Sequence, residues 1–369
     1  MDNQNAQIQE LTQVMSMMID ELTKIKNENA SYKQAIDALK QTVLIQKEME
    51  TRLAEELGKY ERQFAIVSDL FRKEDNRLDN IKYEIWDMIS NNKQPYIPKI
   101  YDYDYTFEKL QNGASIARYG DGEFSIMTNR ERQPFQSIDP ALSARLREVI
   151  QVQDENFLVG IGNLYDDLSE FNSEGKTGIY LYLTEEIRKE HYELLDKNRT
   201  YHNAYITRPF AQMANNRTGG AEKTFNRFKE LWRDRNIIMV EGKLTRLGVG
   251  NDLFDTAASI RRVEGPAVNS FSRYDDILRG TIKHYNDGDL VLIAMGPSAG
   301  VLAYDLFKEG IQAMDIGHID LEYEWFLRDE GQNRCEVKTK YNNEYTNGAR
   351  VEEIDDPEYF SQIVEDFSE

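Results

Sequence analysis

Residues 115–124 read SIARYGDGEF, a short apolar run that ends in a loop of glycine and acidic residues. The same pattern recurs in the later part of the chain, where each apolar run leads into a loop rich in Gly, Asp or Asn and then into a helical pattern. The runs are Ser115 to Arg118, Phe157 to Ile161, Ile237 to Val240, Leu290 to Ala294 and Ala313 to Ile316. This alternation predicts an α/β fold with a mostly parallel sheet and covering helices.

The first loop carries two carboxylates, Asp121 and Glu123, just after Arg118. Ligands of parallel sheets bind where the strands end, so this loop is a candidate site. Hard oxygen ligands beside the flexible Gly120 suit Mg²⁺ or Mn²⁺, and such ions usually take further oxygens from substrate phosphates. Arg118 would supply a forked donor for a phosphate oxygen. Two carboxylates at this spacing are also common in solvated turns, so the residues alone leave both interpretations open.

Two further loops have the form of anion sites. Residues 241–254, EGKLTRLGVGNDLF, combine Lys243 and Arg246 with three glycines and the start of a helix, which suits a diphosphate. No Walker or dinucleotide fingerprint is present, and a turn with a helix cap explains the stretch equally well. Residues 295–300, MGPSAG, also join a strand to a helix, most often a structural arrangement.

The loop at residues 315–325, DIGHIDLEYEW, holds four carboxylates and His318. Such a cluster at a strand end is a candidate for acid–base chemistry or for metal binding. The pattern does not decide whether the loop is extended or helical. We expect a functional role for His318, whereas the remaining histidines lie in polar stretches and are expected at the surface. These are His191, His202 and His284.

The N-terminal part, residues 8–88, carries a seven-residue apolar repeat. With Ile8 at position a and Leu11 at position d, 20 of the 24 a and d positions are apolar. This repeat predicts a coiled coil over residues 1–92 that joins copies of the chain into a parallel homo-oligomer. The alternative is a helical hairpin with its turn at Gly58.

Charges beside this repeat favour parallel pairing. In a parallel pair, Glu21 would face Lys26 of the other helix, and Glu28 would face Lys33. Asn29 lies at an a position, where a single buried asparagine favours two strands. The complementarity is lost in the C-terminal half of the repeat, where packing on the chain's own second domain or on another protein is the alternative.

Prolines within residues 93–100 end the repeat and indicate a linker. The predicted α/β domain spans residues 101–340. The remaining residues, 341–369, are rich in Asp and Glu, and we expect a solvated acidic tail without an assigned role.

Composition excludes several classes of protein. Lys and Arg total 45 against 65 Asp and Glu, and a net charge of -20 argues against nucleic-acid binding. The single cysteine, Cys335, excludes an internal disulfide. Neither a run of about 18 apolar residues nor a signal-peptide pattern is found, so we expect a cytoplasmic protein without a transmembrane segment. A peripheral position at the inner face of the membrane is the alternative.

Five motifs together resemble the GT-D-fold glycosyltransferase domain, a bacterial family long described as a domain of unknown function, which has a DxE motif in place of DxD. The motifs are RYGDGEF, EGKLTRLGVGNDLFD, RRVEGPAVNSF, LIAMGPSAGVLAYDLF and DIGHIDLEYEWFL. They stand in family order over Tyr101 to Trp325. The resemblance implies a GT-D-like, Rossmann-like sheet and a transferase that moves a hexose, with glucose expected, from a UDP-sugar to a glycan on a glycoprotein or surface polysaccharide.

The resemblance also implies roles for individual residues. Asp121 and Glu123 occupy the DxE positions and would hold Mn²⁺ or Mg²⁺. From position alone, we expect Asp320 or Glu322 to act as the catalytic base and His318 to be a further metal or phosphate contact. Residues implied to contact the donor are Arg118, Gly120, Lys243, Arg246, Asn251, Asp252 and Asn269. Docking beside other glycosyltransferases, as further partners, is a role we expect of the N-terminal stalk and not one that the resemblance implies.

Two other functions compete with this one. The chain is a coiled-coil scaffold if its α/β domain only binds nucleotide or is inactive. A phosphotransferase would transfer a terminal phosphate and would not release UDP. Several carboxylates converging at strand ends favour the enzyme, because an inert domain has no physical need for them.

Overall fold

The computed structural model describes residues 2–91, 96–130, 136–329, 331, 333–342, 344 and 348–369, and within the first helix the side chains of residues 10–29, 31–78 and 81. The chain divides into two compact units, Met1–Arg72 and Lys73–Glu369. Residues 93–95 of the predicted linker lie outside the described residues, as do the side chains of the repeat positions Ile8, Ile85 and Met88.

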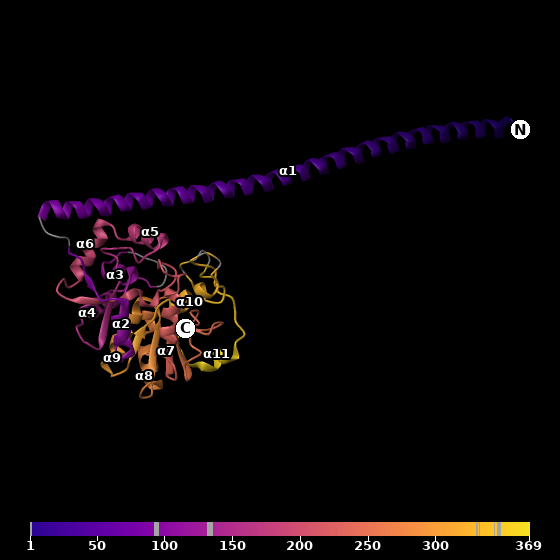
Figure 1. Ribbon diagram of the computed structural model, residues 1–369. Helices are drawn as coiled ribbons and strands as arrows, with labels where there is room; N and C mark the ends of the chain where they lie inside the picture. The colour runs from indigo at the N-terminus through magenta and orange to yellow at the C-terminus, as the bar shows by residue number, and fades with distance from the viewer. Residues whose placement is uncertain are drawn as a thin grey trace. The chain divides into compact units, whose positions relative to one another are not determined.

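Helix α1 (Asp2–Asn91) is one continuous helix that runs through Gly58 (Figure 1), so the hairpin alternative is wrong. Its a and d side chains are exposed: Leu11 is 63% exposed, Leu39 65% and Phe64 76%. Within the described residues, no helix has the length and apolar character needed to cross a membrane.

Within the residues that the structure describes, nine strands form a single sheet in which every neighbouring pair runs parallel. The strands are β1 (Lys99–Ile100), β2 (Ser115–Tyr119), β3 (Phe157–Ile161), β4 (Thr200–Asn203), β5 (Asn236–Gly242), β6 (Ser259–Gly265), β7 (Leu290–Ala294), β8 (Ala313–Asp315) and β9 (Ile363–Asp366). Their order is β1-β4-β3-β2-β8-β7-β5-β6-β9. The predicted α/β class with a mostly parallel sheet is confirmed.

Ten helices follow or cover these strands in the part of the chain that the structure describes after α1. They are α2 (Tyr103–Gln111), α3 (Asp121–Met127), α4 (Pro140–Val149), α5 (Ser173–Tyr182), α6 (Glu185–Leu194), α7 (Gly220–Leu231), α8 (Tyr274–His284), α9 (Ala299–Lys308), α10 (Ile319–Leu327) and α11 (Pro357–Gln362), with short 3₁₀ turns at Ala204–Thr207, Ser270–Arg273 and Gly296–Ser298.

Both faces of the sheet are buried. Successive side chains of a strand point to opposite faces, so one strand contributes to the hydrophobic cores on both sides. Ala117 of β2 joins the core formed with α3, α4, α8 and α9. Its neighbour Ile116 joins the core formed with α2, α7 and α10. This double cover leaves the ends of the central strands as the places where polar loops can line a cavity.

The C-terminal residues differ from the predicted solvated tail. α11 is followed by β9, which pairs with β6 as the last strand of the sheet, and Tyr359 is only 3% exposed. The acidic side chains on β9 have basic partners: Glu365 pairs with Lys283 at 2.5 Å and Asp366 with Lys243 at 3.1 Å. These ion pairs allow an acidic segment to form an edge strand.

Candidate active site

A pocket of about 450 Å³ lies at the carboxyl ends of the central strands. β2 and β8 are neighbours there. The chain continues from β2 towards β3 on one side, while β8 is reached from β7 on the other side. Loops that leave such a switch point diverge and open a crevice, the usual ligand site of a parallel sheet.

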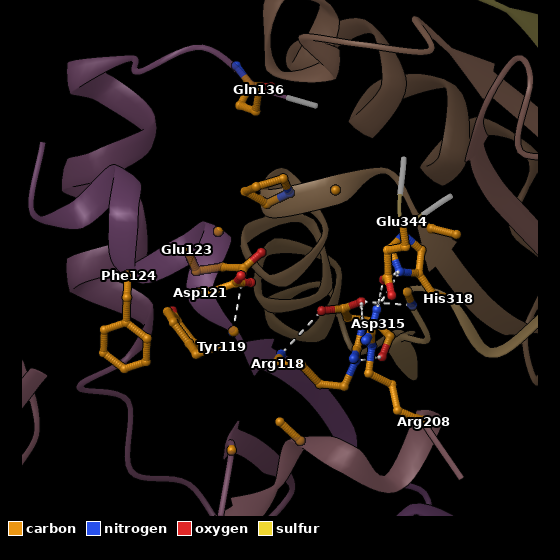
Figure 2. A pocket seen from close by; sticks show the side chains of 18 of the residues that line it. Arg118, Tyr119, Asp121, Glu123, Phe124, Gln136, Arg208, Asp315, His318 and Glu344 are labelled. Carbon is orange, nitrogen blue, oxygen red and sulfur yellow. Dashed lines mark hydrogen bonds and ion pairs between the residues drawn. The ribbon is translucent and has the colours of Figure 1, made fainter. Parts of the chain in front are cut away.

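The predicted carboxylate pair lines this pocket. Asp121 and Glu123 lie in the first turn of α3, which begins directly after β2. Figure 2 shows their carboxylates close together and facing the same open space. Glu123 Oε2 accepts the backbone N–H of Gly120 at 2.7 Å. Burial, reinforced by the carboxylate of Asp315, raises the pKa of Glu123 to about 7.

Arg118 is held by the end of β8. Its Nε donates to the Asp315 carbonyl and its Nη2 to Asp315 Oδ1, each at 2.8 Å. Gly317, in the left-handed region with φ +45°, lies where any Cβ would collide with the Arg118 guanidinium. Glycine at position 317 therefore allows the β8 loop to pass directly over Arg118.

A second charged group lies across the pocket from the carboxylate pair (Figure 2). His318 Nδ1 is 2.7 Å from Arg208 Nη2 and 2.8 Å from Glu344 Oε1. Arg208 also pairs with Glu344, and Arg334 Nε donates to Glu344 Oε2 at 3.1 Å. Burial alone would raise the pKa of Glu344, but these basic neighbours hold it well below its usual range.

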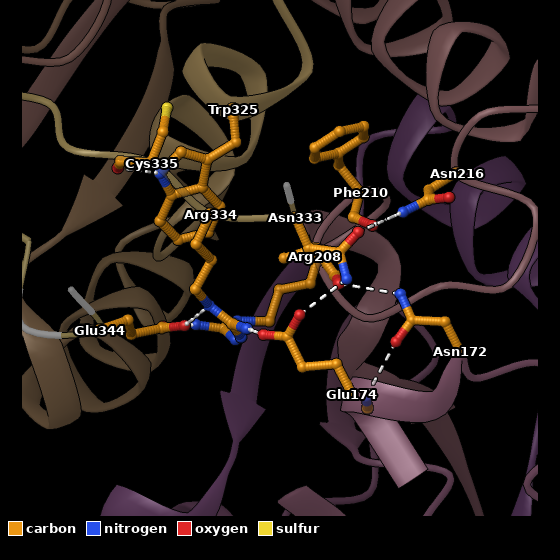
Figure 3. Close-up of polar contacts among 12 residues, drawn as sticks. Asn172, Glu174, Arg208, Phe210, Asn216, Trp325, Asn333, Arg334, Cys335 and Glu344 are labelled. Carbon is orange, nitrogen blue, oxygen red and sulfur yellow. Dashed lines mark hydrogen bonds and ion pairs between the residues drawn. The ribbon is translucent and has the colours of Figure 1, made fainter. Parts of the chain in front are cut away.

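Arg334 links this group to a more distant element. Its guanidinium pairs with Glu344 and with Glu174 near the start of α5 (Figure 3). The same guanidinium lies 5.5 Å from the centre of the Trp325 ring. Arg334 thus connects the pocket wall to α5.

The other end of the pocket is aromatic. The ring of His191 stacks on Phe124, with centroids 3.7 Å apart. Its Nδ1 lies 2.6 Å from Tyr165 Oη and its Nε2 lies 2.9 Å from Tyr182 Oη. Burial, with Arg188 nearby, lowers the pKa of His191 to about 3, so the ring is neutral.

The expectation that three histidines lie at the surface is wrong for two of them. His191 is 1% exposed and His202 is 9% exposed. Both lie against aromatic side chains, His202 with Tyr101 and Tyr105. The polar stretches around them conceal aromatic neighbours that are distant in sequence.

Several residues predicted to contact the donor have other partners. Lys243 binds Asp366 and Ser368, and Arg246 donates to the carbonyl oxygens of Thr339 and Glu352. The described residues that line the pocket do not include five of the predicted donor contacts, namely Lys243, Arg246, Asn251, Asp252 and Asn269.

The other three donor-contact residues also hold protein groups. Asn251 donates to Asp320 and Glu324 at 2.8 and 2.7 Å. Asp252 pairs with Lys229 at 2.8 Å, and Asn269 accepts the backbone N–H of residue 137 at 2.7 Å. These contacts support structural roles for the three side chains. That they also contact the sugar-nucleotide donor stays a prediction.

The two carboxylates predicted as bases are both firmly bound. Asp320 lines the pocket but is 2% exposed, and Lys340 Nζ lies 2.5 Å from its Oδ2. Glu322 Oε2 accepts the backbone N–H groups of Phe210 and Ala211, each at 2.8 Å. Burial raises the pKa of Glu322 to about 7.

Part of the site could not be recognised from the sequence. Arg208, Arg334 and Glu344 line the pocket together with Arg118 and His318, yet no local motif contains them. Arg208 follows the short polar strand β4, and the other two lie beyond α10. Their position in the pocket depends on the strand order.

The described side chains offer few ligands for a metal ion. Among the described residues, no group of three or more His, Cys, Asp or Glu side chains is arranged to hold a metal ion. The carboxylates of Asp121 and Glu123 nevertheless fit a cation that completes its shell with water and substrate oxygens, as Mg²⁺ and Mn²⁺ commonly do.

Comparison with known proteins identifies the class. The family model described as "Glycosyltransferase GT-D fold" matches residues 116–345, so the chain belongs to this glycosyltransferase family. This match confirms the resemblance drawn from the five motifs. It spans both the carboxylate pair at Asp121 and the far wall of the pocket at Glu344.

Individual relatives agree with the family. "Probable glycosyl transferase Gly" of Streptococcus gordonii is 35% identical over 262 residues, and "Glycosyltransferase GlyD" of Streptococcus pneumoniae is 33% identical over 260 residues. The matches cover 71% and 69% of this chain but only 37% and 31% of those proteins. The chain therefore spans about a third of the length of these relatives.

Solved structures show the same fold. "A New Glycosyltransferase (DUF1792) from Streptococcus sanguinis" has a TM-score of 0.67 and 33% identity, with 73% of this chain and 99% of that chain covered. "The highly conserved domain of unknown function 1792 has a distinct glycosyltransferase fold" has a TM-score of 0.67 and 32% identity, with 73% and 96% covered. The predicted GT-D-like fold is thus confirmed.

Proposed function

We propose that this protein is a metal-dependent hexosyltransferase that moves glucose or a related hexose from a UDP-sugar to a glycan on a glycoprotein or surface polysaccharide. The observation that carries the proposal is the pocket itself. Asp121 and Glu123 line one wall, and the basic side chains of Arg118, Arg208 and Arg334 line the pocket with them. A carboxylate pair facing several guanidinium groups suits a metal-bound diphosphate.

The metal site is proposed at Asp121 and Glu123. Burial and the neighbouring carboxylates of Asp315 and Asp121 raise the pKa of Glu123, and a divalent ion would supply a compensating positive charge. When bound there, Mn²⁺ or Mg²⁺ would neutralise the charge that develops on the departing UDP. Donor oxygens would complete the coordination, since the protein supplies few ligands at this point.

The donor phosphates are proposed to bind between the metal site and the Arg208 wall. Arg208 and Arg334 present planar donors that match phosphate oxygens. In the structure both guanidinium groups bind the carboxylate of Glu344, which occupies the position proposed for a phosphate. A phosphate that enters would compete with Glu344 for these groups, and His318 would be a further phosphate contact.

The catalytic base is proposed to be one of the two predicted carboxylates, Asp320 or Glu322. Of the two predicted carboxylates, Asp320 is the one that lines the pocket. Its carboxylate is held in an ion pair with Lys340. Glu322 binds the backbone beside Arg208, which supports a positioning role for that side chain. If an Asp320→Asn, Glu322→Gln variant kept near wild-type transfer, neither residue would be the base.

We also propose that the enzyme works in the cytoplasm or at the inner face of the membrane. The chain has a single cysteine, Cys335, and therefore no internal disulfide, as expected of a protein in a reducing compartment. A glycan acceptor and neighbouring glycosyltransferases would then be its partners. A fractionation experiment with the native host would test the location.

The decisive experiment measures UDP release from a panel of nucleotide sugars with Mn²⁺, Mg²⁺ or chelator. The test variant is Asp121→Asn, Glu123→Gln. The matched control is Asp154→Asn, Glu155→Gln, an exposed acidic pair in the turn before β3 that does not line the pocket.

We expect metal-dependent release of UDP from one hexose donor, lost by at least about 100-fold in the test variant and unchanged in the control. Transfer or hydrolysis of the terminal phosphate of an added nucleoside triphosphate, without release of UDP from any sugar donor, would establish the phosphotransferase. Failure to bind or turn over any nucleotide sugar would favour the scaffold function.

A further inference from the structure

The a and d positions in the N-terminal half of α1 form an apolar stripe, called the seam below, that is exposed to water. Leu11, Met18, Leu22 and Leu39 are each about two-thirds exposed, at 63%, 63%, 65% and 65%. Long helices in water are stabilised mainly by burying such a stripe, not by helix propensity alone. This seam must therefore be covered by another surface.

The spacing of the seam indicates another helix as that surface. The apolar positions repeat every seven residues from Ile8 through Val43, interrupted by Asn29 at an a position. A strict seven-residue period keeps the stripe on one side only if two or more helices supercoil around each other. We propose that the partner is a second copy of this chain, paired in parallel over residues 8–47.

Flanking charges support parallel pairing over this half. The e positions form a column of lysines at residues 26, 33, 40 and 47, whereas two of the g positions are Glu21 and Glu28. In a parallel pair, g faces the e position of the next heptad, so both glutamates face lysines and Lys40 and Lys47 face uncharged residues. An antiparallel pair limited to the same half would place Lys26 opposite Lys33 and would form no opposite-charge contact.

Asn29 adds a second argument for parallel pairing in register. In that arrangement it faces its own counterpart, and the two amides can bond to each other across the seam. A full-length antiparallel pair would instead place Asn29 against Val67 of the other helix. It would likewise place Glu74 against Leu22, so two polar groups would be buried without a partner.

The pairing is confined to the first half because the seam changes after Lys47. Glu50 and Glu74 occupy seam positions there, and Glu56 would face Glu61 in a parallel pair. Like charges at these positions oppose association. The proposal does not depend on the proposed function. If that function holds, pairing places two pockets on one stalk and raises their effective concentration on a polymeric acceptor.

Single cysteines test the orientation in a full-length chain that carries Cys335→Ser. In the parallel pair, Ile25→Cys faces itself, so mild oxidation should link most of the protein into a disulfide dimer. The matched control is Gln34→Cys, which lies on the opposite side of the helix and should remain unlinked. A link formed only when Ile25→Cys is mixed with Phe71→Cys would overturn the proposal in favour of the full-length antiparallel pair.

The mass in solution tests the partner. Light scattering of the purified chain should give twice the 43.0 kDa of one chain. Leu22→Lys, Leu39→Lys should give the single mass, while Ser31→Lys, Gln34→Lys on the outer face should remain paired. Buried Trp232 and Trp325 should keep the same fluorescence in both variants, which shows that the second unit is folded. A wild-type chain of single mass at micromolar concentration would overturn the proposal, as would pairing that the Leu22→Lys, Leu39→Lys variant retains.

Discussion

Replacing Glu123 with glutamine should stabilise the metal-free protein, and the gain should grow with pH. In the unfolded chain Glu123 ionises around pH 4.5, whereas burial in the pocket raises its pKa to about 7 in the folded protein. The folded state therefore opposes ionisation, and the free energy of unfolding falls as the pH rises from about 4.5 to 7. Glutamine removes this cost and its amide oxygen can still accept the Gly120 N–H.

The size of the effect follows from the two pKa values. At about 1.4 kcal/mol per pKa unit, the difference between 4.5 and about 7 means that ionising Glu123 lowers the free energy of unfolding by at most about 3 kcal/mol. Partial contact with water in the pocket reduces this figure, so we expect the advantage of Glu123→Gln to increase by about 2 kcal/mol between pH 5 and pH 8.

Urea unfolding of chelator-treated protein at both pH values measures this advantage, followed by the fluorescence of the buried Trp232 and Trp325. The exposed control Glu155→Gln should show no such increase. Adding Mn²⁺ should stabilise the wild type more than Glu123→Gln, because the cation needs the carboxylate. An advantage that is absent, or that is equal at pH 5 and pH 8, would refute the reasoning.

Three further predictions concern the interior and the stalk. Lys340→Met should lower the free energy of unfolding by about 3 kcal/mol, because it leaves Asp320 and Glu324 without their buried partner; the exposed Lys338→Met should change it by less than about 0.5 kcal/mol, and equal losses in urea unfolding would contradict this. His191→Phe should cost about 1–3 kcal/mol at pH 7, because the hydroxyls of Tyr165 and Tyr182 lose their hydrogen bonds to the imidazole ring. Since the pKa of His191 is lowered to about 3, the wild type loses stability as the pH falls below about 6.5, so this difference should narrow at pH 4.5 in thermal melts; a constant difference would count against a buried neutral ring. Asn29→Ile should raise the melting temperature of the stalk helix measured by circular dichroism and weaken its preference for two strands; a lower melting temperature would place Asn29 outside the seam.

The strands that could be predicted are the central ones. The five apolar runs correspond to β3, β2, β8, β7 and β5, which are adjacent in the sheet. These strands are buried on both faces, so most of their residues are apolar. The outer strands β1, β4, β6 and β9 carry polar side chains that find partners only in the folded protein. Arg262 of β6, for example, is 3% exposed and pairs with Glu241 at 2.5 Å.

The candidate site divides in the same way. Asp121 and Glu123 are adjacent in one loop, so their spacing was visible in the sequence, and Arg118 precedes them. The other wall needs Arg208, Arg334 and Glu344, which lie more than 80 residues from that loop and meet only through the strand order. Conversely, the loop that contains Lys243 and Arg246 has the composition of a phosphate-binding loop, but these two side chains bind the C-terminal segment.

The most direct test of the account is the binding of Mn²⁺ with and without UDP, counted by electron paramagnetic resonance of the free ion. Because no group of three or more His, Cys, Asp or Glu side chains among the described residues is arranged to hold a metal, Mn²⁺ alone should bind weakly, and UDP should tighten its binding by at least about tenfold, or about 1.4 kcal/mol. Asp121→Asn, Glu123→Gln should abolish the gain. Equal Mn²⁺ affinity with and without UDP, or UDP binding that chelator and this variant leave unchanged, would contradict the account.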